Sequence, residues 1–242
     1  MAARGRRDGA LPVLAVGFAD MVGFTTLSQQ LTEEELAAVV ARFEELAHDT
    51  ITAGGGRLVK MIGDEAMFVA DTALDAARIG LDLAETYADD ELLSDVRVAL
   101  AVGPVLVQDG DYYGPVVNLA SRAVNMALPG SVLVTDEFHR ALDQGTAEGE
   151  FAMRALRPRV VKDVGRVQLW VLHRPGAEPV APDRRMGRRW DRITEVLHDI
   201  DELRERGERL ISGARAGRPG NGSSSSGAGE AHGGDAEGPK VE

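Results

Sequence analysis

The feature that most constrains the fold is a tight connection between two short apolar runs. Residues 57–62 and 66–70 have the length and composition of strands, and little more than Gly63 and Asp64 separates them. Glycine and aspartate at such a connection are typical of a β-hairpin. We therefore expect two antiparallel neighbours in a sheet, with Asp64 held at the turn between them.

Segments of strand and helix character alternate around this hairpin. An apolar run over 11–19 comes first, and Thr32 with Glu35 three residues later forms a capping-box pattern that predicts a helix start. This alternation predicts an α+β fold, a ferredoxin-like sandwich with a mainly antiparallel sheet and helices packed on one face. The other expected helices cover 71–87, 115–127 and 136–142. The other expected strands cover 96–102, a second short strand that follows Gly103 and Pro104 and ends at 107, and then 131–135, 160–162 and 167–172.

Composition divides the chain into four parts. We expect a disordered N-terminus over 1–10 and one folded domain over 11–175. A charged amphipathic helix with an apolar stripe is expected over 184–212. The Gly/Ser-rich acidic segment over 213–242 is expected to be disordered.

Charge and composition exclude several classes of protein. The 39 acidic residues exceed the 27 Lys and Arg residues, giving a net charge of −12, which argues against a nucleic-acid partner. The absence of cysteine excludes disulfides, thiolate zinc sites and cysteine nucleophiles. No apolar run approaches the roughly 20 residues of a membrane span, and no cleavable export segment is present. We expect a soluble cytoplasmic protein.

Two aspartates carry most of the functional information. Asp20 follows the first apolar run, and Asp64 lies at the hairpin turn, so each is expected at a strand end. Two carboxylates that converge on one edge of a sheet are a natural site for Mg²⁺ with a phosphate ligand. This arrangement predicts chemistry on a nucleoside triphosphate.

Four further polar residues accompany the aspartates. Lys60 precedes Asp64 by four residues, and Asp111 ends a turn. Asn118 and Arg122 lie four residues apart, so they share one face of the helix that Pro115 opens. Each residue alone is typical of an ordinary turn or a solvated helix face, and only their coincidence indicates a site.

Three motifs together resemble the catalytic domain of class III nucleotidyl cyclases. They are Phe-Ala-Asp-Met-Val-Gly-Phe-Thr at 18–25, Lys-Met-Ile-Gly-Asp at 60–64 and Gly-Pro-Val-Val-Asn-Leu-Ala-Ser-Arg at 114–122. They occur in the family's order and spacing, and the resemblance runs from about residue 13 to 172. It implies that residues 11–175 form a nucleotidyl cyclase catalytic domain, here an adenylate cyclase that makes cyclic AMP and pyrophosphate from ATP.

The resemblance also implies roles for single residues. Asp20 and Asp64 would bind two Mg²⁺ or Mn²⁺ ions per site. Lys60 would donate to a ring nitrogen of the purine, and Asp111 would accept from the 6-amino group of adenine. Guanine has a carbonyl at position 6, which Asp111 would repel. Guanylate-selective relatives carry Glu and a small residue at these two places.

The resemblance further implies roles for residues that would contact the ribose and the phosphates. Asn118 would orient the ribose, and Arg122 would stabilise charge on the α-phosphate during in-line attack by the 3′-hydroxyl. Lys162 matches a lysine that contacts the terminal phosphates. Asp163 stands where the family has glycine, and its charge would weaken triphosphate binding.

In this family the site lies between two head-to-tail domains. Since the chain holds both sets of residues in one domain, we expect a homodimer with two shared sites and an inactive monomer. The short segment before Asp20 implies regulation through the C-terminal helix or none. Two alternatives stay open: a nucleotide-binding regulatory domain without turnover, and another two-carboxylate enzyme such as a polymerase palm or a diguanylate cyclase.

Overall fold

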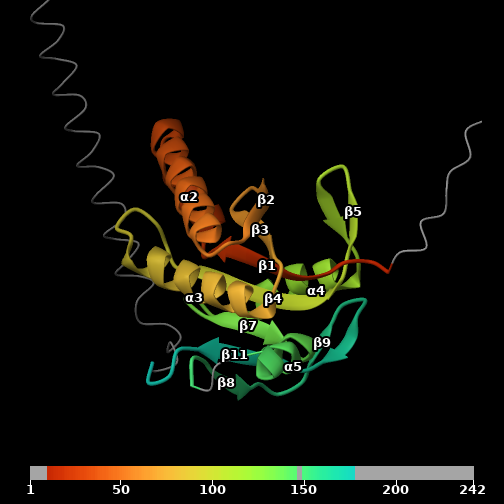
Figure 1. The fold of residues 1–242 in the computed structure, drawn as a ribbon. Helices are drawn as coiled ribbons and strands as arrows, with labels where there is room; N and C mark the ends of the chain where they lie inside the picture. The colour runs from red at the N-terminus through yellow and green to blue at the C-terminus, as the bar shows by residue number, and fades with distance from the viewer. Residues whose placement is uncertain (1–9, 146–148, 178–242) are drawn as a thin grey trace, which may run out of the picture. The chain divides into compact units, whose positions relative to one another are not determined.

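The computed structural model describes residues 10–145 and 149–177. Its centre is a seven-stranded sheet with the strand order β2-β3-β1-β4-β7-β11-β8 (Figure 1). Neighbouring strands are antiparallel except for the parallel pair β4 and β7. The strands of this sheet are β1 (Val13–Met21), β2 (Arg57–Ile62), β3 (Glu65–Ala70), β4 (Val96–Pro104), β7 (Val132–Thr135), β8 (Ala152–Ala155) and β11 (Leu169–His173).

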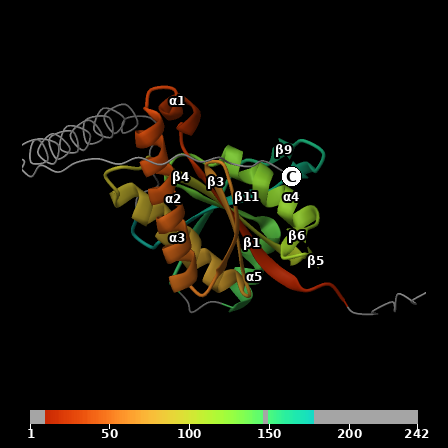
Figure 2. The same cartoon turned by 90° about the horizontal axis from the view of Figure 1, so that it is seen from above.

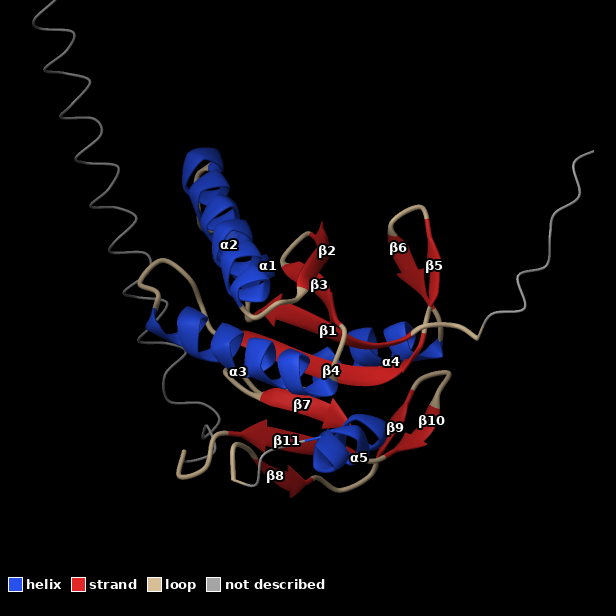
Figure 3. Ribbon diagram, viewed as in Figure 1, coloured by secondary structure: helices blue, strands red, loops and turns tan. Residues whose placement is uncertain are grey.

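Helices and two small hairpins surround the sheet (Figure 3). The hairpins are formed by β5 (Leu106–Gln108) with β6 (Asp111–Tyr113), and by β9 (Arg159–Val161) with β10 (Gly165–Val167). The helices are α1 (Phe24–Ser28), α2 (Glu33–Ala53), α3 (Ala73–Asp89), α4 (Pro115–Ala123), the 3₁₀ turn η1 (Val124–Met126) and α5 (Asp136–Gly145).

The first half of the chain has the predicted ferredoxin-like arrangement. Strand β1, the helices α1 and α2, the β2–β3 hairpin, helix α3 and strand β4 follow one another, and their strands lie in the order β2-β3-β1-β4. This is the split βαβ pattern with antiparallel neighbours throughout. The predicted hairpin is confirmed, with Ile62 opposite Glu65 across the turn.

Helices cover both faces of the sheet, so the prediction that they pack on one face is wrong for α4. In β1, Ala15 and Ala19 face α2, α3 and α5, whereas Val16 and Phe18 belong to the cluster formed with α4. Figure 2 shows α2 and α3 on one side of the sheet and α4 on the other. The physical reason is the nearly continuous apolar character of β1, because a strand without polar alternation must be covered on both sides.

The predicted capping box is present at the start of α2. The Thr32 hydroxyl accepts from the Glu35 backbone N–H at 3.3 Å, and the Glu35 carboxylate accepts from the Thr32 N–H at 2.7 Å. The two reciprocal bonds satisfy donors that the first turn of a helix leaves free. Helix α2 therefore begins at the residue that the sequence pattern indicates.

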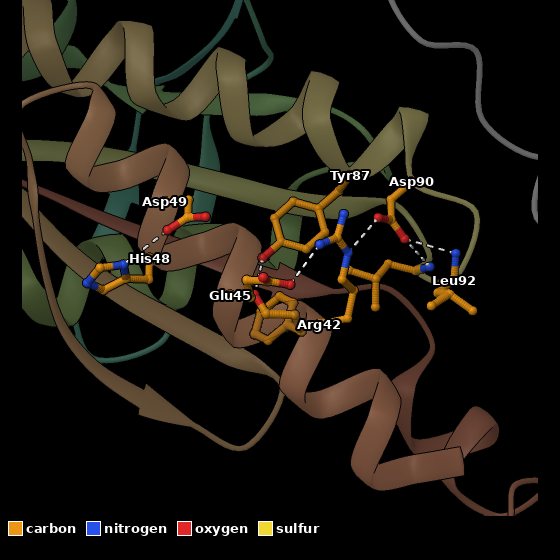
Figure 4. Close-up of polar contacts among 9 residues, drawn as sticks. Arg42, Glu45, His48, Asp49, Tyr87, Asp90 and Leu92 are labelled. Carbon is orange, nitrogen blue, oxygen red and sulfur yellow. Dashed lines mark hydrogen bonds and ion pairs between the residues drawn. The ribbon is translucent and has the colours of Figure 1, made fainter.

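Helices α2 and α3 are joined by contacts at the end of α3 (Figure 4). The Tyr87 hydroxyl donates to the carbonyl of Phe43 at 2.6 Å, and their rings lie 5.3 Å apart. The Arg42 guanidinium pairs with Asp90 at 3.0 Å. These bonds orient the helix pair over β1 and β4, on the face opposite α4.

Helix α1 and the strands β6, β8 and β10 were not predicted, and some predictions cannot be compared with the structure. Helix α1 and strand β8 are short, and neither has a clear periodic signal. The N-terminus over 1–10 that we expected to be disordered lies almost wholly outside the described residues, and the expected helix over 184–212 and expected disordered tail over 213–242 lie wholly outside them. Among the described helices, none is long and apolar enough to cross a membrane.

The packing around β1 gives a stability prediction. A Cβ atom at Gly17 would lie 2.1 Å from the Phe68 ring, so Gly17→Ala must displace that ring from the core. We expect the variant to lose about 1–3 kcal/mol of unfolding free energy in urea denaturation. Gly103→Ala is the matched control, because its Cβ would meet Val116 no closer than 3.5 Å. Equal stability of the two variants would contradict this account of the core.

Candidate active site

The two predicted aspartates come together at one end of β1. Asp20 is the penultimate residue of β1, and Asp64 lies in the turn between β2 and β3. The Met21 backbone N–H donates to the carbonyl of Asp64 at 3.0 Å, which fixes the turn against the end of the strand. Burial is the main cause that raises the pKa of Asp20, and the nearby negative charge of Asp64 adds a smaller contribution.

Asp20 is nearly buried and is paired with a cation that the sequence interpretation missed. Only 9% of the residue is exposed, and its carboxylate accepts a hydrogen bond from the guanidinium of Arg97. Burial raises the pKa of Asp20, and Arg97, which lies opposite it on β4, offsets part of that effect. The sequence signal that could have identified Arg97 was a lone arginine at the start of an apolar strand.

A third carboxylate adds to the negative charge at this end of the sheet. Glu65 lies opposite Asp20 in the β1–β3 pairing. Burial, followed by the charges of Asp20 and Asp64, raises the pKa of Glu65 to about 7. The end of β1 therefore carries more negative charge than Arg97 balances, which is an environment that favours a bound cation.

The donor set at the end of β1 fits a hard divalent ion only in part. Carboxylate oxygens are the ligands that Mg²⁺ prefers, and Asp20 and Asp64 supply them. Within residues 10–145 and 149–177, no three histidine or acidic side chains are arranged as a complete metal site. An ion at Asp20 and Asp64 would take further oxygen ligands from water or a phosphate, as Mg²⁺ commonly does.

Lys60 and Asp111 form an ion pair between two hairpins. Lys60 lies on β2, Asp111 opens β6, and the Lys60 ammonium donates to Asp111 Oδ2 at 2.6 Å. This hydrogen bond is the main cause that lowers the pKa of Asp111. A hydrogen bond from Arg57 to the Tyr112 hydroxyl joins the same two hairpins. A partly exposed donor and acceptor therefore lie side by side between the two hairpins.

Helix α4 presents the next pair of predicted residues. Pro115 is its first residue, and Gly114 before it has a φ of 145°, a value that favours glycine. Asn118 and Arg122 lie one turn apart and line a cavity of about 760 Å³. Other parts of its wall come from α5 and the β9–β10 hairpin, including Asp136 and Arg166.

Arg122 ties α4 to the β9–β10 turn. Its Nη1 donates to the carbonyl oxygen of Lys162, and its Nη2 lies 3.2 Å from Asp163 Oδ2. Lys162 contributes its backbone to this contact. Asp163 has a φ of 60°, the left-handed conformation in which glycine is favoured.

The structure thus brings the predicted residues together in three groups. Asp20 and Asp64 form the first, Lys60 and Asp111 the second, and the third lies on α4 and the β9–β10 turn. Among the described residues, no hydrogen bond or ion pair joins one group to another. The roles assigned to these residues remain predictions.

Comparison with known proteins shows that residues 10–174 match the family model described as the adenylate and guanylate cyclase catalytic domain. An adenylate cyclase of Streptomyces coelicolor is 41% identical over 184 residues, covering 66% of this chain and 48% of that protein. An adenylate cyclase of Glutamicibacter nicotianae is 42% identical, covering 70% of this chain and 42% of that protein. The chain spans about half the length of the curated relatives it matches.

Solved structures support the same fold. The catalytic core of a rhodopsin-guanylyl cyclase with converted specificity, in complex with ATPαS, has a TM-score of 0.63 at 22% identity. That likeness covers 69% of this chain and 98% of the other. A Trypanosoma brucei adenylate cyclase in its monomeric state has a TM-score of 0.62 at 19% identity, covering 71% and 92% of the two chains. At these identities the likeness shows the fold alone.

The charge at the end of β1 predicts a pH-dependent effect of Glu65→Gln. The pKa of Glu65 is about 7 in the folded chain, against an ordinary 4.5. As pH rises between these values, the unfolded state loses the proton first, so folding becomes less favourable until the pH exceeds about 7. Glutamine cannot ionise, so Glu65→Gln removes this loss of folding stability at higher pH. We expect the variant to gain little stability at pH 4 and about 2 kcal/mol at pH 8, measured by urea unfolding without metal.

The exposed Glu44 offers the control for this measurement. Glu44→Gln removes the same charge from the surface of α2, far along the chain from the acidic turn. The difference between the Glu44→Gln variant and the parent should not grow with pH. A gain for Glu65→Gln that is equal at pH 4 and pH 8 would show that Glu65 is not held neutral by its surroundings.

Proposed function

The chain belongs to the adenylate and guanylate cyclase catalytic domain family, and we propose that it is an adenylate cyclase that converts ATP to 3′,5′-cyclic AMP and pyrophosphate. The observation that carries the choice of ATP is the Lys60–Asp111 pair. An ammonium can donate to a ring nitrogen of adenine, and an adjacent carboxylate can accept from its 6-amino group. Against guanine, the same carboxylate would face a carbonyl oxygen, which is a repulsive contact.

The acidic end of β1 would hold the metal ions. Asp20 and Asp64 supply hard oxygen ligands, and burial together with the charges of Asp20 and Asp64 raises the pKa of Glu65 beside them. Two bound Mg²⁺ or Mn²⁺ ions would supply Lewis-acid activation of the 3′-hydroxyl and neutralisation of the triphosphate. A metal at Asp20 would also compete with Arg97 for the carboxylate.

The residues of α4 would act on the reacting groups. Asn118 would orient the ribose by hydrogen bonding, and the Arg122 guanidinium would stabilise the charge that grows on the α-phosphate. Lys162 would contact the terminal phosphates. The 3′-oxygen forms a bond to the α-phosphorus as the bond to the β-phosphate oxygen breaks; pyrophosphate leaves, and the hydroxyl proton is lost to solvent.

We also propose that each site is shared between two copies of the chain. Within the described part of one copy, no hydrogen bond or ion pair links the aspartate group to the Lys60–Asp111 pair or to the α4 group. A head-to-tail homodimer would place the aspartates of one copy against the purine and phosphate residues of the other. The two sites of such a dimer would be equivalent, and a monomer would be inactive.

Substrate choice tests the proposed function directly. The purified chain should form cyclic AMP from ATP with Mg²⁺ or Mn²⁺, and much less cyclic GMP from GTP. A Lys60→Glu, Asp111→Cys double change should lower the ratio of kcat/KM for ATP over GTP by at least about tenfold, since each lost contact accounts for 1 kcal/mol or more. Binding of ATP without product would identify a regulatory domain instead. Unchanged selectivity of the double variant would refute the purine-reading roles.

Mixing two inactive variants tests the shared site. Lys60→Ala and Asp20→Ala damage different halves, so a mixed dimer keeps one complete site. With random pairing at equal amounts, half of the dimers are mixed and half of their sites are intact. Activity should therefore return to about a quarter of the wild-type value.

A matched mixture controls for this complementation. Lys60→Ala and Asn118→Ala damage the same half, so no site in their mixed dimer is complete, and the mixture should stay inactive. Size-exclusion chromatography verifies that each mixture dimerises. If the first mixture dimerised and stayed inactive, the shared-site model would be wrong.

A further inference from the structure

The contact between Arg122 and Asp163 has a consequence for nucleotide binding. Arg122 Nη2 lies 3.2 Å from Asp163 Oδ2, while Nη1 donates to the carbonyl of Lys162. The guanidinium that would face the α-phosphate is therefore already bound to an anion of its own chain. A phosphate oxygen and the Asp163 carboxylate would compete for the same donor.

The Asp163 side chain is not required by the turn that carries it. With a φ of 60°, the backbone at this position favours glycine, and among other residues aspartate and asparagine tolerate it best. The β9–β10 hairpin would form as well with glycine or asparagine. The Asp163 carboxylate thus adds a negative charge to this turn, and the backbone conformation of the turn does not require it.

Nearby anions in the same cavity wall are already engaged by another cation. Arg140 lies 2.8 Å from Asp136 and 3.4 Å from Glu137, both at the start of α5. Among the described carboxylates, Asp163 is the one with an ion pair to Arg122. Beside the neutral carbonyl of Lys162, Asp163 is therefore the described anion that is paired with Arg122.

We propose that Asp163 is an internal competitor that lowers the affinity of the site for nucleotide by occupying Arg122. This inference rests on the proposed function, in which Arg122 meets the α-phosphate. The pair is accessible to solvent, with 36% of the Arg122 side chain and 64% of the Asp163 side chain exposed. Such a pair is weak enough for a more highly charged phosphate to displace, so Asp163 is a positioning residue that sets affinity and does not block turnover.

Asp163→Asn tests the competition with little change to the backbone. Asparagine tolerates the left-handed conformation and keeps the size of the side chain while removing its charge. The probe is 3′-deoxy-ATP with Mg²⁺, which has no 3′-hydroxyl to react, and its Kd is measured by isothermal titration calorimetry. We expect the Kd to fall about threefold, the effect of losing one exposed ion pair, with a matching fall in the KM for ATP and no fall in kcat.

The Arg122→Gln background separates competition at Arg122 from a general charge effect. If Asp163 acts through Arg122, Asp163→Asn should change the Kd by less than about 1.5-fold once the guanidinium is gone. Asp109→Asn is the matched control, because Asp109 also has a positive φ, at 53°, in a hairpin turn. That change should leave the Kd unaltered.

The outcomes distinguish this inference from the proposed function. If the unmodified chain binds 3′-deoxy-ATP and forms cyclic AMP, but Asp163→Asn leaves the Kd unchanged, the role of Asp163 is wrong and the proposed function stands. Equal tightening in both backgrounds also overturns that role. If the unmodified chain neither binds 3′-deoxy-ATP nor forms product, the proposed function fails, and this inference fails with it.

Discussion

Burial of strand β1 on both faces is the constraint on which the rest of the structure depends. β1 pairs with β3 along one edge and with β4 along the other, and helices cover both of its sides. A carboxylate near the end of such a strand is costly unless it is paired. Arg97 offsets part of this cost for Asp20, yet burial still raises the pKa of Asp20, and burial with the neighbouring negative charges raises the pKa of Glu65. The fold therefore concentrates unbalanced negative charge where a cation would be stabilised.

Pairing of opposite charges is the common theme of the candidate site. Asp20 is bound to Arg97, Lys60 to Asp111, and Arg122 to Asp163. Each pair keeps a charged group oriented, and two of the pairs are exposed enough for a nucleotide to exchange partners with them. Under the proposed function, metal ions would take Asp20 while phosphate oxygens would take Arg122. Binding would then be an exchange of ion pairs, whose net free energy is small compared with the gross attraction.

Local signals predicted much of the fold. The capping box at Thr32, the hairpin around Gly63 and the proline that opens α4 each depend on a few neighbouring residues, and all three are confirmed. Short elements such as α1 and β8 escaped prediction because their few residues carry no periodicity. Helix coverage of the second face was missed because an amphipathic helix indicates that one of its sides is buried, but does not indicate against which face of the sheet.

The sequence by itself determined the family, the antiparallel hairpin and the identity of the polar residues offered as a site. Its motifs could do so because they combine residue type with short spacing. Only the tertiary structure decided how these residues are partnered. Arg97 meets Asp20 through the register of β1 with β4, and Arg122 meets Asp163 through the packing of α4 beside a distant hairpin. Such pairs join residues tens of positions apart, so their existence depends on packing that no local pattern records.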